Sequence, residues 1–96
     1  MIIETAQMEI IGGQETAFEA ALEEAKKVLA QAKGFHGIYV HRGVERPNVY
    51  LLALEWETVA DHTVGFRESE LFTQWRSLIG PYFANPPVVE HWELIG

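Results

Sequence analysis

Residues Val49 to Trp56 constrain the fold of this chain more than any other segment. The first six of them, Val49 to Leu54, are apolar without interruption, so a strand formed here has two apolar faces. A strand with one face in water alternates between apolar and polar residues instead. The segment therefore predicts a strand over residues 49–57 that is covered on both faces, by helices of the same chain on one side and by a partner molecule on the other.

A short helix is expected directly after this strand. Thr58 is a favourable N-cap residue, and Asp61 follows three residues later, in a position like that of a capping box. Val59, His62 and Phe66 would then lie on one face of the helix, directed at the sheet. We expect a functional site at this junction of strand and helix, with His62 at its wall.

Three further segments have patterns typical of strands, at residues 2–11, 35–45 and 88–95. In the first of them Ala6, Met8 and Ile10 share one face, and Gly12-Gly13 ends the strand. A turn is predicted at Arg46-Pro47-Asn48, because proline fixes φ and asparagine tolerates left-handed geometry. The strands before and after this turn therefore form an antiparallel hairpin.

Two longer segments have the spacing of amphipathic helices. Apolar residues three and four apart predict a helix over residues 14–33, which Gly34 ends. A second helix is expected from Ser69, as its N-cap, to Gly80-Pro81. The resulting order, β-α-β-β-α-β, is that of the ferredoxin-like α+β fold, a four-stranded antiparallel sheet with both helices on one face. Residues 1–96 are expected to form a single domain.

The composition argues against several classes of function. Fourteen acidic and seven basic residues give a net charge of −7, which disfavours binding to nucleic acids and to anionic membranes. The chain contains no cysteine, and therefore no disulfide, thiolate nucleophile or thiolate-bound metal. No apolar run reaches the ~20 residues of a membrane span, and the N-terminus lacks the pattern of a signal peptide. Together these features favour a cytoplasmic protein.

The apolar strands also predict a homodimer joined through the sheet faces. The last strand carries Val88 and Trp92 on one side and Val89 and Ile95 on the other. Because the helices cover only one side of the sheet, the other side would expose a broad apolar patch in a monomer. A second copy of the chain would bury this patch in a two-fold contact.

Motifs spread over the whole chain resemble those of a known family. Glu55-x-x-x-x-x-Asp61-His62 follows the third strand, and Phe66-Arg67-Glu68-Ser69-x-x-Phe72-x-x-Trp75 comes next. The chain then closes with Pro86-Pro87-x-Val89-x-His91-Trp92, which runs from the preceding loop into the last strand. With a first strand that ends at Gly13, an amphipathic helix and a glycine-bounded second strand, this pattern is similar to the antibiotic biosynthesis monooxygenase domain of the dimeric α+β barrel superfamily.

The resemblance implies a dimeric α+β barrel with one of several activities. The superfamily includes quinol or polyketide oxygenases that use no metal or flavin, and also haem-degrading enzymes. The haem-degrading members carry a tryptophan, a histidine and a first-strand asparagine where this chain has Phe66, Arg76 and Ala6 (or Gln7). The resemblance therefore does not extend to haem degradation. His62 stands where several members carry a histidine.

His62 is the best candidate for a catalytic residue. An imidazole titrates near neutral pH and could accept a proton from a phenol or hydroquinone. The alternative is a histidine at the edge of the core that is hydrogen-bonded to a neighbour. Several aromatic residues could line a pocket for an aromatic substrate, although residues at such helical spacing are more often plain core. These are Trp56, Phe66, Phe72, Trp75, Tyr82 and Phe83.

The remaining histidines and two arginines are further candidates. His41 and His91 would join His62 in binding substrate if their strands direct them toward the helices. No two histidines have the spacing of a zinc-binding helix, so neither a metal nor another cofactor is expected. Arg42 and Arg76 are candidate ligands for an anion, with solvated surface as the alternative.

Two functions from different classes follow from these residues. The first is a cofactor-independent monooxygenase acting on a small electron-rich aromatic, such as a phenol, quinol or polyketide. His62 would act as base or orienting residue, Trp56 and Trp75 as pocket walls, and the substrate anion would react with O₂ itself. The second is a non-catalytic small-molecule-binding or stress-related protein, because fold alone does not decide function. A cavity beside His62 favours the first function, and a filled core favours the second.

Overall fold

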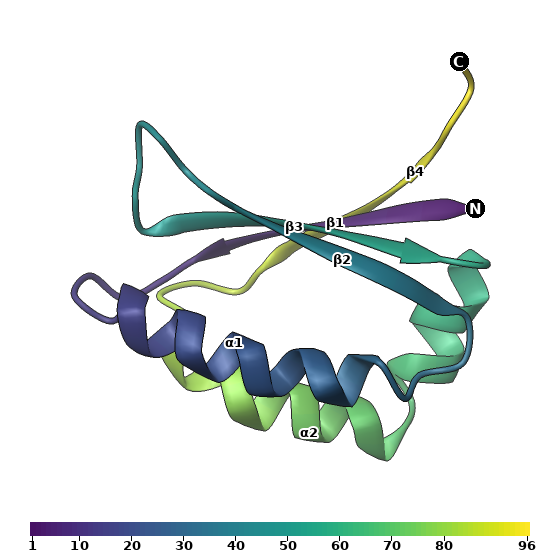
Figure 1. Ribbon diagram of the computed structural model, residues 1–96, viewed down its shortest axis with the longest axis horizontal. Coiled ribbons are helices and arrows are strands. Elements are labelled where there is room, and N and C mark those ends of the chain that lie inside the picture. Colours follow the sequence, from purple (N-terminus) through teal and green to yellow (C-terminus); the bar gives the residue numbers. More distant parts are fainter.

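The computed structural model describes all 96 residues and confirms the ferredoxin-like α+β fold (Figure 1). A four-stranded antiparallel sheet forms one layer, and the two helices lie together on one of its faces. Neither helix has the length and apolar character of a membrane span. The elements are β1 (Ile2–Glu9), α1 (Glu15–Leu29), β2 (Phe35–Arg42), β3 (Val49–Trp56), η1 (Asp61–Phe66), α2 (Glu70–Ile79), η2 (Gly80–Tyr82) and β4 (Val88–Glu93).

The sheet has the strand order β2-β3-β1-β4, so β4 forms one edge beside β1. β3 pairs with β2 and with β1, which gives its apolar residues neighbours on both sides. The pairing of β1 with β4 places Glu4 directly opposite His91. Because side chains directly opposite each other lie on the same face of a sheet, these two residues share the face that the helices cover.

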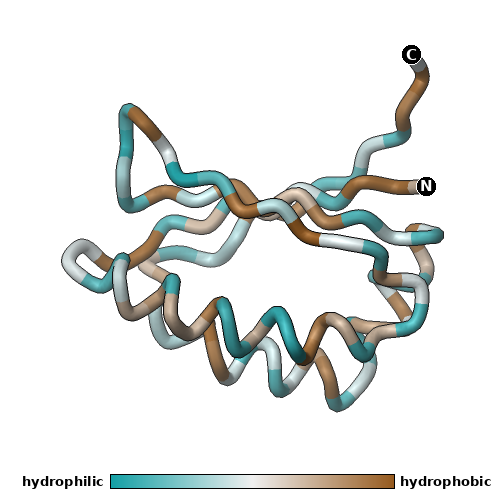
Figure 2. The backbone as a smooth tube through the Cα atoms, viewed as in Figure 1, coloured by the Kyte–Doolittle hydropathy of each residue, from teal (hydrophilic) through white to brown (hydrophobic).

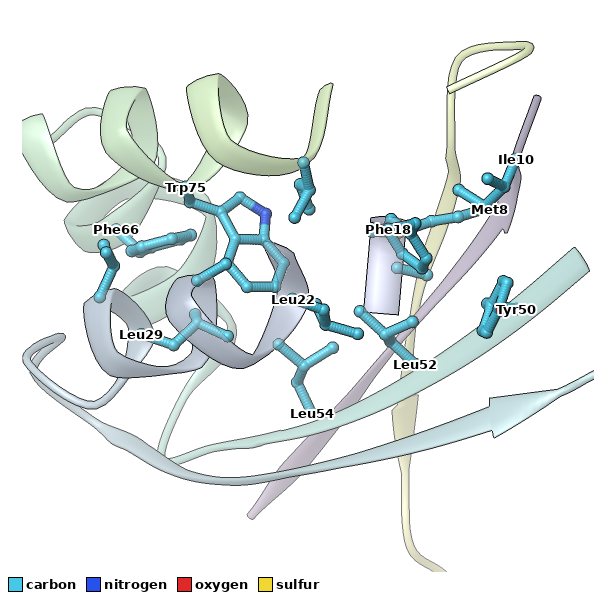
Figure 3. Packing of buried hydrophobic residues seen from close by; sticks show 14 of the residues in the cluster. Met8, Ile10, Phe18, Leu22, Leu29, Tyr50, Leu52, Leu54, Phe66 and Trp75 are labelled. Atoms are coloured by element: carbon cyan, nitrogen blue, oxygen red, sulfur yellow. The ribbon is translucent and has the colours of Figure 1, made fainter. Parts of the chain in front are cut away.

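The core lies between this face and the helices. Figure 3 shows Trp75 of α2 reaching into the space between α1 and the sheet, near Leu29 and Leu54. Hydrophobic and hydrophilic segments alternate along both helices, as amphipathic helices require (Figure 2). On the strands the expected alternation is present, since Ala6, Met8 and the neighbouring Ile10 are all buried.

Several element boundaries differ from the prediction. The first helix ends at Leu29 rather than at residue 33, because the chain then tightens into three-residue turns. The N–H groups of Gln31 and Ala32 donate to carbonyl groups three residues earlier. Ser69 has the extended backbone of an N-cap, but its hydroxyl donates to the carbonyl of Phe66 and so caps the preceding helix instead. The strands also end one to three residues earlier than expected.

The short helix after β3 is present and begins with the expected cap. The backbone N–H of Asp61 donates to Thr58 Oγ1 at 3.1 Å, and the hydroxyl donates to the Asp61 carboxylate at 2.9 Å. The segment is wound as a π-helix, in which the N–H of Arg67 donates to the carbonyl of His62, five residues earlier. Val59 directly follows the cap residue Thr58 and precedes the π-helical segment. Val59 is 40% exposed, so its predicted place beside His62 is wrong.

Gly34 lies in the loop between α1 and β2 and packs against Asp61 of the short helix. Replacing Gly34 with alanine is expected to destabilise the fold. Gly34 has φ of +80°, and a Cβ atom there would lie 2.4 Å from Asp61 Oδ2, in the capping interaction. The backbone alone should cost about 1–2 kcal/mol, and displacement of the cap should add to this. Urea denaturation measures the loss. Gly12→Ala is the matched control, because a Cβ atom there meets nothing within 4 Å; an equal effect of both substitutions would contradict the argument.

Candidate functional site

A cavity of about 330 Å³ lies between the sheet and the helical layer. This volume is in the range of small-molecule sites, and nine of its fifteen lining residues are hydrophobic, so the cavity suits a small apolar ligand. The walls come from both helices, from η1, from three strands and from the loop before β4. The lining residues are Glu4, Ala6, Met8, Leu29, Leu54, His62, Phe66, Arg67, Phe72, Trp75, Arg76, Phe83, Pro86, Pro87 and Val89.

A row of three polar side chains from three elements lies beside this cavity: Glu4 on β1, His62 on η1 and His91 on β4. His62 Nε2 lies 3.3 Å from Glu4 Oε1. The other ring nitrogen, His62 Nδ1, is hydrogen-bonded to His91 Nε2 at 2.8 Å. The imidazole of His62 is therefore fixed between a carboxyl group and a second imidazole.

The local sequence explains why a carboxyl group is buried here. Glu4 precedes Ala6 and Met8 at two-residue spacing, so its side chain faces the helices as theirs do. The indole N–H of Trp56 donates to Glu4 Oε1 at 2.9 Å. The Trp56 ring also stacks on the imidazole of His62, with 5.3 Å between the centroids. Trp56 therefore contacts both Glu4 and His62 and fixes the orientation of their side chains.

Burial shifts the pKa values of these groups in opposite directions. Removal from water raises the pKa of Glu4 to about 7, while the hydrogen bond from Trp56 and the charge of Arg67 lower it. Burial, the charge of Arg67 and the nearby His91 lower the pKa of His62 to about 4. Burial and Arg67 also lower the pKa of His91. At neutral pH both imidazoles are therefore mainly uncharged, and Glu4 is divided between its acid and carboxylate forms.

Each end of this row has one atom without a hydrogen-bond partner in the chain, Glu4 Oε2 at one end and His91 Nδ1 at the other. Every fully buried side-chain oxygen or nitrogen has a hydrogen-bond partner. Glu4 Oε2 makes no hydrogen bond within the chain, so it must keep contact with open space, and Glu4 borders the cavity. His91 Nδ1 also lacks a partner, and His91 does not line the cavity. One end of the row therefore opens into the cavity and the other end opens outside it.

The structure brings together most of the residues expected at the site. His62, Phe66, Phe72 and Trp75 line the cavity. The Phe66 ring packs edge-on against Phe72 and Trp75, with centroid separations of 5.6 Å and 6.5 Å. Trp56 is completely buried behind His62 and is not part of the wall.

The two other expected histidines have different positions. His91 lies outside the wall but contacts His62 directly. The expectation that His41 joins the site is wrong. His41 pairs with Leu51 across β2 and β3, and its Nδ1 lies 3.1 Å from the carbonyl of Leu51. It follows Val40, which faces the helices, so His41 lies on the opposite face of the sheet.

Of the two arginines considered for an anion, only Arg76 borders the cavity. Its guanidinium lies 5.9 Å from the ring centroid of Phe72 and 5.8 Å from that of Phe83. Arg42 instead donates to the carbonyl of Pro47 and to Glu19. Arg67, which the sequence interpretation did not select, also lines the cavity.

No three histidine or acidic side chains are arranged to hold a metal ion. The reason lies in the row itself, because the two nitrogens of His62 point at different partners. A metal ion requires several ligand atoms that converge on one point.

Glu4 is the candidate site residue that the sequence interpretation missed. Its signal was present, because a charged residue stands in the series with Ala6, Met8 and Ile10, which alternation directs into the core. Charged side chains are rarely buried unless they are paired or functional. A carboxyl group at this position therefore indicated a polar site inside the fold.

Comparison with known proteins identifies the family. Residues 1–78 match antibiotic biosynthesis monooxygenases, a segment that contains Glu4, His62 and most of the cavity wall. The chain belongs to the antibiotic biosynthesis monooxygenase family. His91 and the loop before β4 lie beyond the matched residues of this family, so the outer end of the polar row is outside the matched segment.

Relatives in this family include proteins similar over their whole length. A solved structure from Bordetella bronchiseptica, described as a candidate antibiotic biosynthesis monooxygenase, is 41% identical, with a TM-score of 0.95 over 98% of this chain and 96% of that chain. The uncharacterized protein YczJ of Bacillus subtilis is 36% identical over 97% of this chain and 98% of its own. A Streptomyces coelicolor monooxygenase in complex with nanaomycin D is 15% identical, covers 99% of this chain and 88% of that chain, and has a TM-score of 0.82. At that identity the likeness concerns the fold alone.

Proposed function

We propose that the protein is a monooxygenase that oxidises a small electron-rich aromatic compound, such as a phenol, quinol or polyketide, by direct reaction with O₂. One observation carries the proposal. An apolar cavity of suitable size contains the open oxygen of a single buried carboxyl group, Glu4 Oε2, whose pKa is raised to about 7. A general base is most effective when its pKa lies near the working pH.

The proton chemistry supports Glu4 rather than His62 as the base. With a pKa of about 4, His62 is a weak acceptor at neutral pH, and its two nitrogens face Glu4 and His91. Glu4 has an open oxygen and the higher pKa. His62 is then a positioning residue that holds the carboxyl group in place. Of the two roles expected from the sequence, base or orienting residue, this proposal gives His62 the second.

The reaction for a phenol begins when the substrate hydroxyl gives its proton to Glu4 Oε2. The ring carbon para to the resulting phenolate forms a bond to O₂, and two electrons from the ring reduce O₂ to the level of a peroxide. Glu4 returns the proton to the outer oxygen. The proton on the same carbon then leaves, the O–O bond breaks, and hydroxide combines with that proton as water. One O₂ and one phenol thus give one quinone and one water.

The cavity walls support this chemistry in two ways. Phe66, Phe72 and Trp75 offer ring faces and edges against which an aromatic substrate can pack. The apolar surroundings exclude water, which strengthens the interaction between the substrate anion and the cations of Arg67 and Arg76. The Streptomyces coelicolor monooxygenase of the same fold, in complex with nanaomycin D, supports the choice of a polyketide-like substrate class.

The test is oxygen uptake by the purified protein with a panel of phenols and hydroquinones. We expect a rate above that of autoxidation without protein, with one O₂ consumed for each quinone formed. A substrate that binds in the cavity, as judged by quenching of tryptophan fluorescence, but causes no oxygen uptake would identify a binding protein instead. Release of hydrogen peroxide in place of water would also contradict the reaction above.

We further propose that the protein acts as a homodimer joined through the uncovered sheet face. Strand pairing puts Tyr39, Leu51, Val88 and Trp92 on the face opposite the helices. These four side chains are 58%, 41%, 59% and 53% exposed in the single chain. The cavity lies on the other side of the sheet, so such a dimer leaves it accessible.

A further inference from the structure

The row Glu4–His62–His91 has the geometry of a path for protons as well as that of a support for one carboxyl group. Each member lies within reach of the next, at 3.3 Å between Glu4 Oε1 and His62 Nε2 and at 2.8 Å between His62 Nδ1 and His91 Nε2. Catalytic hydrogen bonds are often long before substrate binds, so the 3.3 Å between Glu4 Oε1 and His62 Nε2 still allows a proton to pass between them. The outer ends, Glu4 Oε2 and His91 Nδ1, are both open.

We propose that His62 and His91 conduct protons between the cavity carboxyl group of Glu4 and the solvent beyond β4. This inference rests on the proposed function, because it concerns how Glu4, the base of that reaction, loses its own proton before it accepts one from the substrate. When substrate fills the cavity, Glu4 Oε2 loses its contact with water. Oε1 remains connected through the two imidazoles to the far side of the row.

The hydrogen bond between His62 and His91 and the 3.3 Å contact between Glu4 Oε1 and His62 Nε2 together define two states of the row that differ by one proton. In the first, Glu4 is protonated on Oε1 and donates to His62 Nε2, His62 Nδ1–H donates to His91 Nε2, and His91 carries its own proton on Nδ1. In the second, Glu4 is a carboxylate, His62 Nε2–H donates to Oε1, and His91 Nε2–H donates to His62 Nδ1. No histidine is a cation in either state, as their lowered pKa values require.

Conversion of the first state into the second moves three protons by one bond each. The Oε1–H bond of Glu4 breaks as a bond forms at His62 Nε2. The Nδ1–H bond of His62 breaks as a bond forms at His91 Nε2, and the proton on His91 Nδ1 passes to water. One proton has left the carboxyl group, and no electrons have been transferred. Glu4 is then a carboxylate whose free oxygen Oε2 can take the proton of the bound substrate.

The surroundings favour this neutral relay over a charged one. Arg67 is the charge that acts on all three groups, and it opposes a positive charge on either imidazole. β3 contributes only the Trp56 N–H to Glu4, and the cavity residues of α1 and β3, Leu29 and Leu54, carry no charge. His91 lies on the helix-covered side of the sheet, so the proposed dimer face does not cover it.

The decisive test needs no substrate. Nuclear magnetic resonance of the ring nitrogens in ¹⁵N-histidine-labelled protein reports which nitrogen of His62 carries the proton. As the pH falls through the titration of Glu4, we expect the proton of His62 to move from Nε2 to Nδ1 without formation of a cation. In Glu4→Gln this exchange should be lost, because the amide does not titrate. A His62 that keeps one tautomer throughout would overturn the proposal, whether or not the protein is an oxygenase.

The second test uses turnover in the active protein. His91→Phe interrupts the path, and kcat should fall about tenfold, less than on loss of the base itself. Free imidazole in the medium should restore part of the rate, which a purely structural role of His91 would not allow. His91→Gln, which keeps one hydrogen bond to His62, is the second variant in case His91→Phe folds poorly. Its kcat should fall by the same factor. His36→Gln, which replaces a histidine paired with Glu57 at 2.6 Å on the surface, is the matched control and should be unaffected. Full kcat in both His91 variants would overturn the proposal.

Discussion

Replacement of Glu4 with glutamine is expected to lower kcat/KM for oxygen-dependent substrate oxidation by about 10²–10⁴-fold, the usual contribution of a positioned general base. The amide has nearly the same shape and can still accept the hydrogen bond from Trp56. It cannot take a proton from a phenol. In the unmodified protein kcat/KM should rise with pH and level off above about 7, the pKa of Glu4, whereas the residual rate of the variant should lack this step.

Glu45→Gln is the matched control for this substitution. Glu45 is an exposed residue between β2 and β3 that lies outside the cavity and beyond the paired residues of the sheet, so its loss should leave turnover unchanged. If Glu4→Gln kept full activity, or if His62→Gln alone removed the step in the pH profile while Glu4→Gln kept it, the base would not be Glu4.

A measurement of stability against pH distinguishes a loss of activity from a loss of folding. The pKa of Glu4 is about 7 in the folded chain and ordinarily 4.5, so between these values the folded state retains a proton that the unfolded state has lost. The contribution of Glu4 to stability is therefore complete below about pH 4.5 and is lost as the pH rises through 7. Glutamine has no such dependence.

We therefore expect Glu4→Gln to be more stable than the unmodified protein by on the order of 3 kcal/mol at pH 8, but by less than about 1 kcal/mol at pH 5. The lowered pKa of His62 gives a slope of the opposite sign, with stability lost as the pH falls from about 6.5 to 4. This term is present in both proteins and largely cancels in the difference. Urea denaturation at the two pH values provides the comparison.

Much of the fold could be predicted because its signals are local. The unbroken apolar run at Val49 to Leu54 predicted the strand that the structure places inside the sheet, between β1 and β2, and Gly34 has the positive φ that only glycine adopts without strain. Boundaries were less certain, because the last turn before Gly34 is decided by competing hydrogen bonds rather than by residue type. The exposure of Val59 could not be predicted, since helical spacing alone does not show whether the first residue after the cap is covered by the sheet.

The site depends on contacts that the sequence does not specify. His62 could be selected because it follows a strand and a capped helix start, both of which are local features. Its partners come from the register of β1 with β4, which sets Glu4 opposite His91. No local pattern fixes that register, so the row of three side chains could not be foreseen. His41 was misplaced for a simpler reason, because the alternation that directs Val40 inward directs His41 outward.

Leu51→Asp is expected to abolish the homodimer that the uncovered sheet face predicts. Light scattering of the unmodified chain at micromolar concentration should give twice its mass of 10.9 kDa. The four exposed apolar side chains of this face, with Leu51 on the central strand β3, would be removed from water together, at roughly 25 cal/mol per Å² of apolar surface before association entropy is subtracted. In a two-fold contact one substitution introduces two carboxylates into the interface, each without a partner. The dissociation constant should rise by more than about 10³-fold, with monomer or aggregate as the product.

Val44→Asp is the matched control for this experiment, because Val44 is 88% exposed between β2 and β3, beyond the paired residues of the sheet. It makes the same change of a branched apolar side chain to a carboxylate, yet it should leave the dimer intact. The two variants together separate the sheet face from apolar surface in general. A stable monomer of the unmodified chain would contradict the proposal, since the uncovered face of β3 would then remain apolar in water without a partner to explain it.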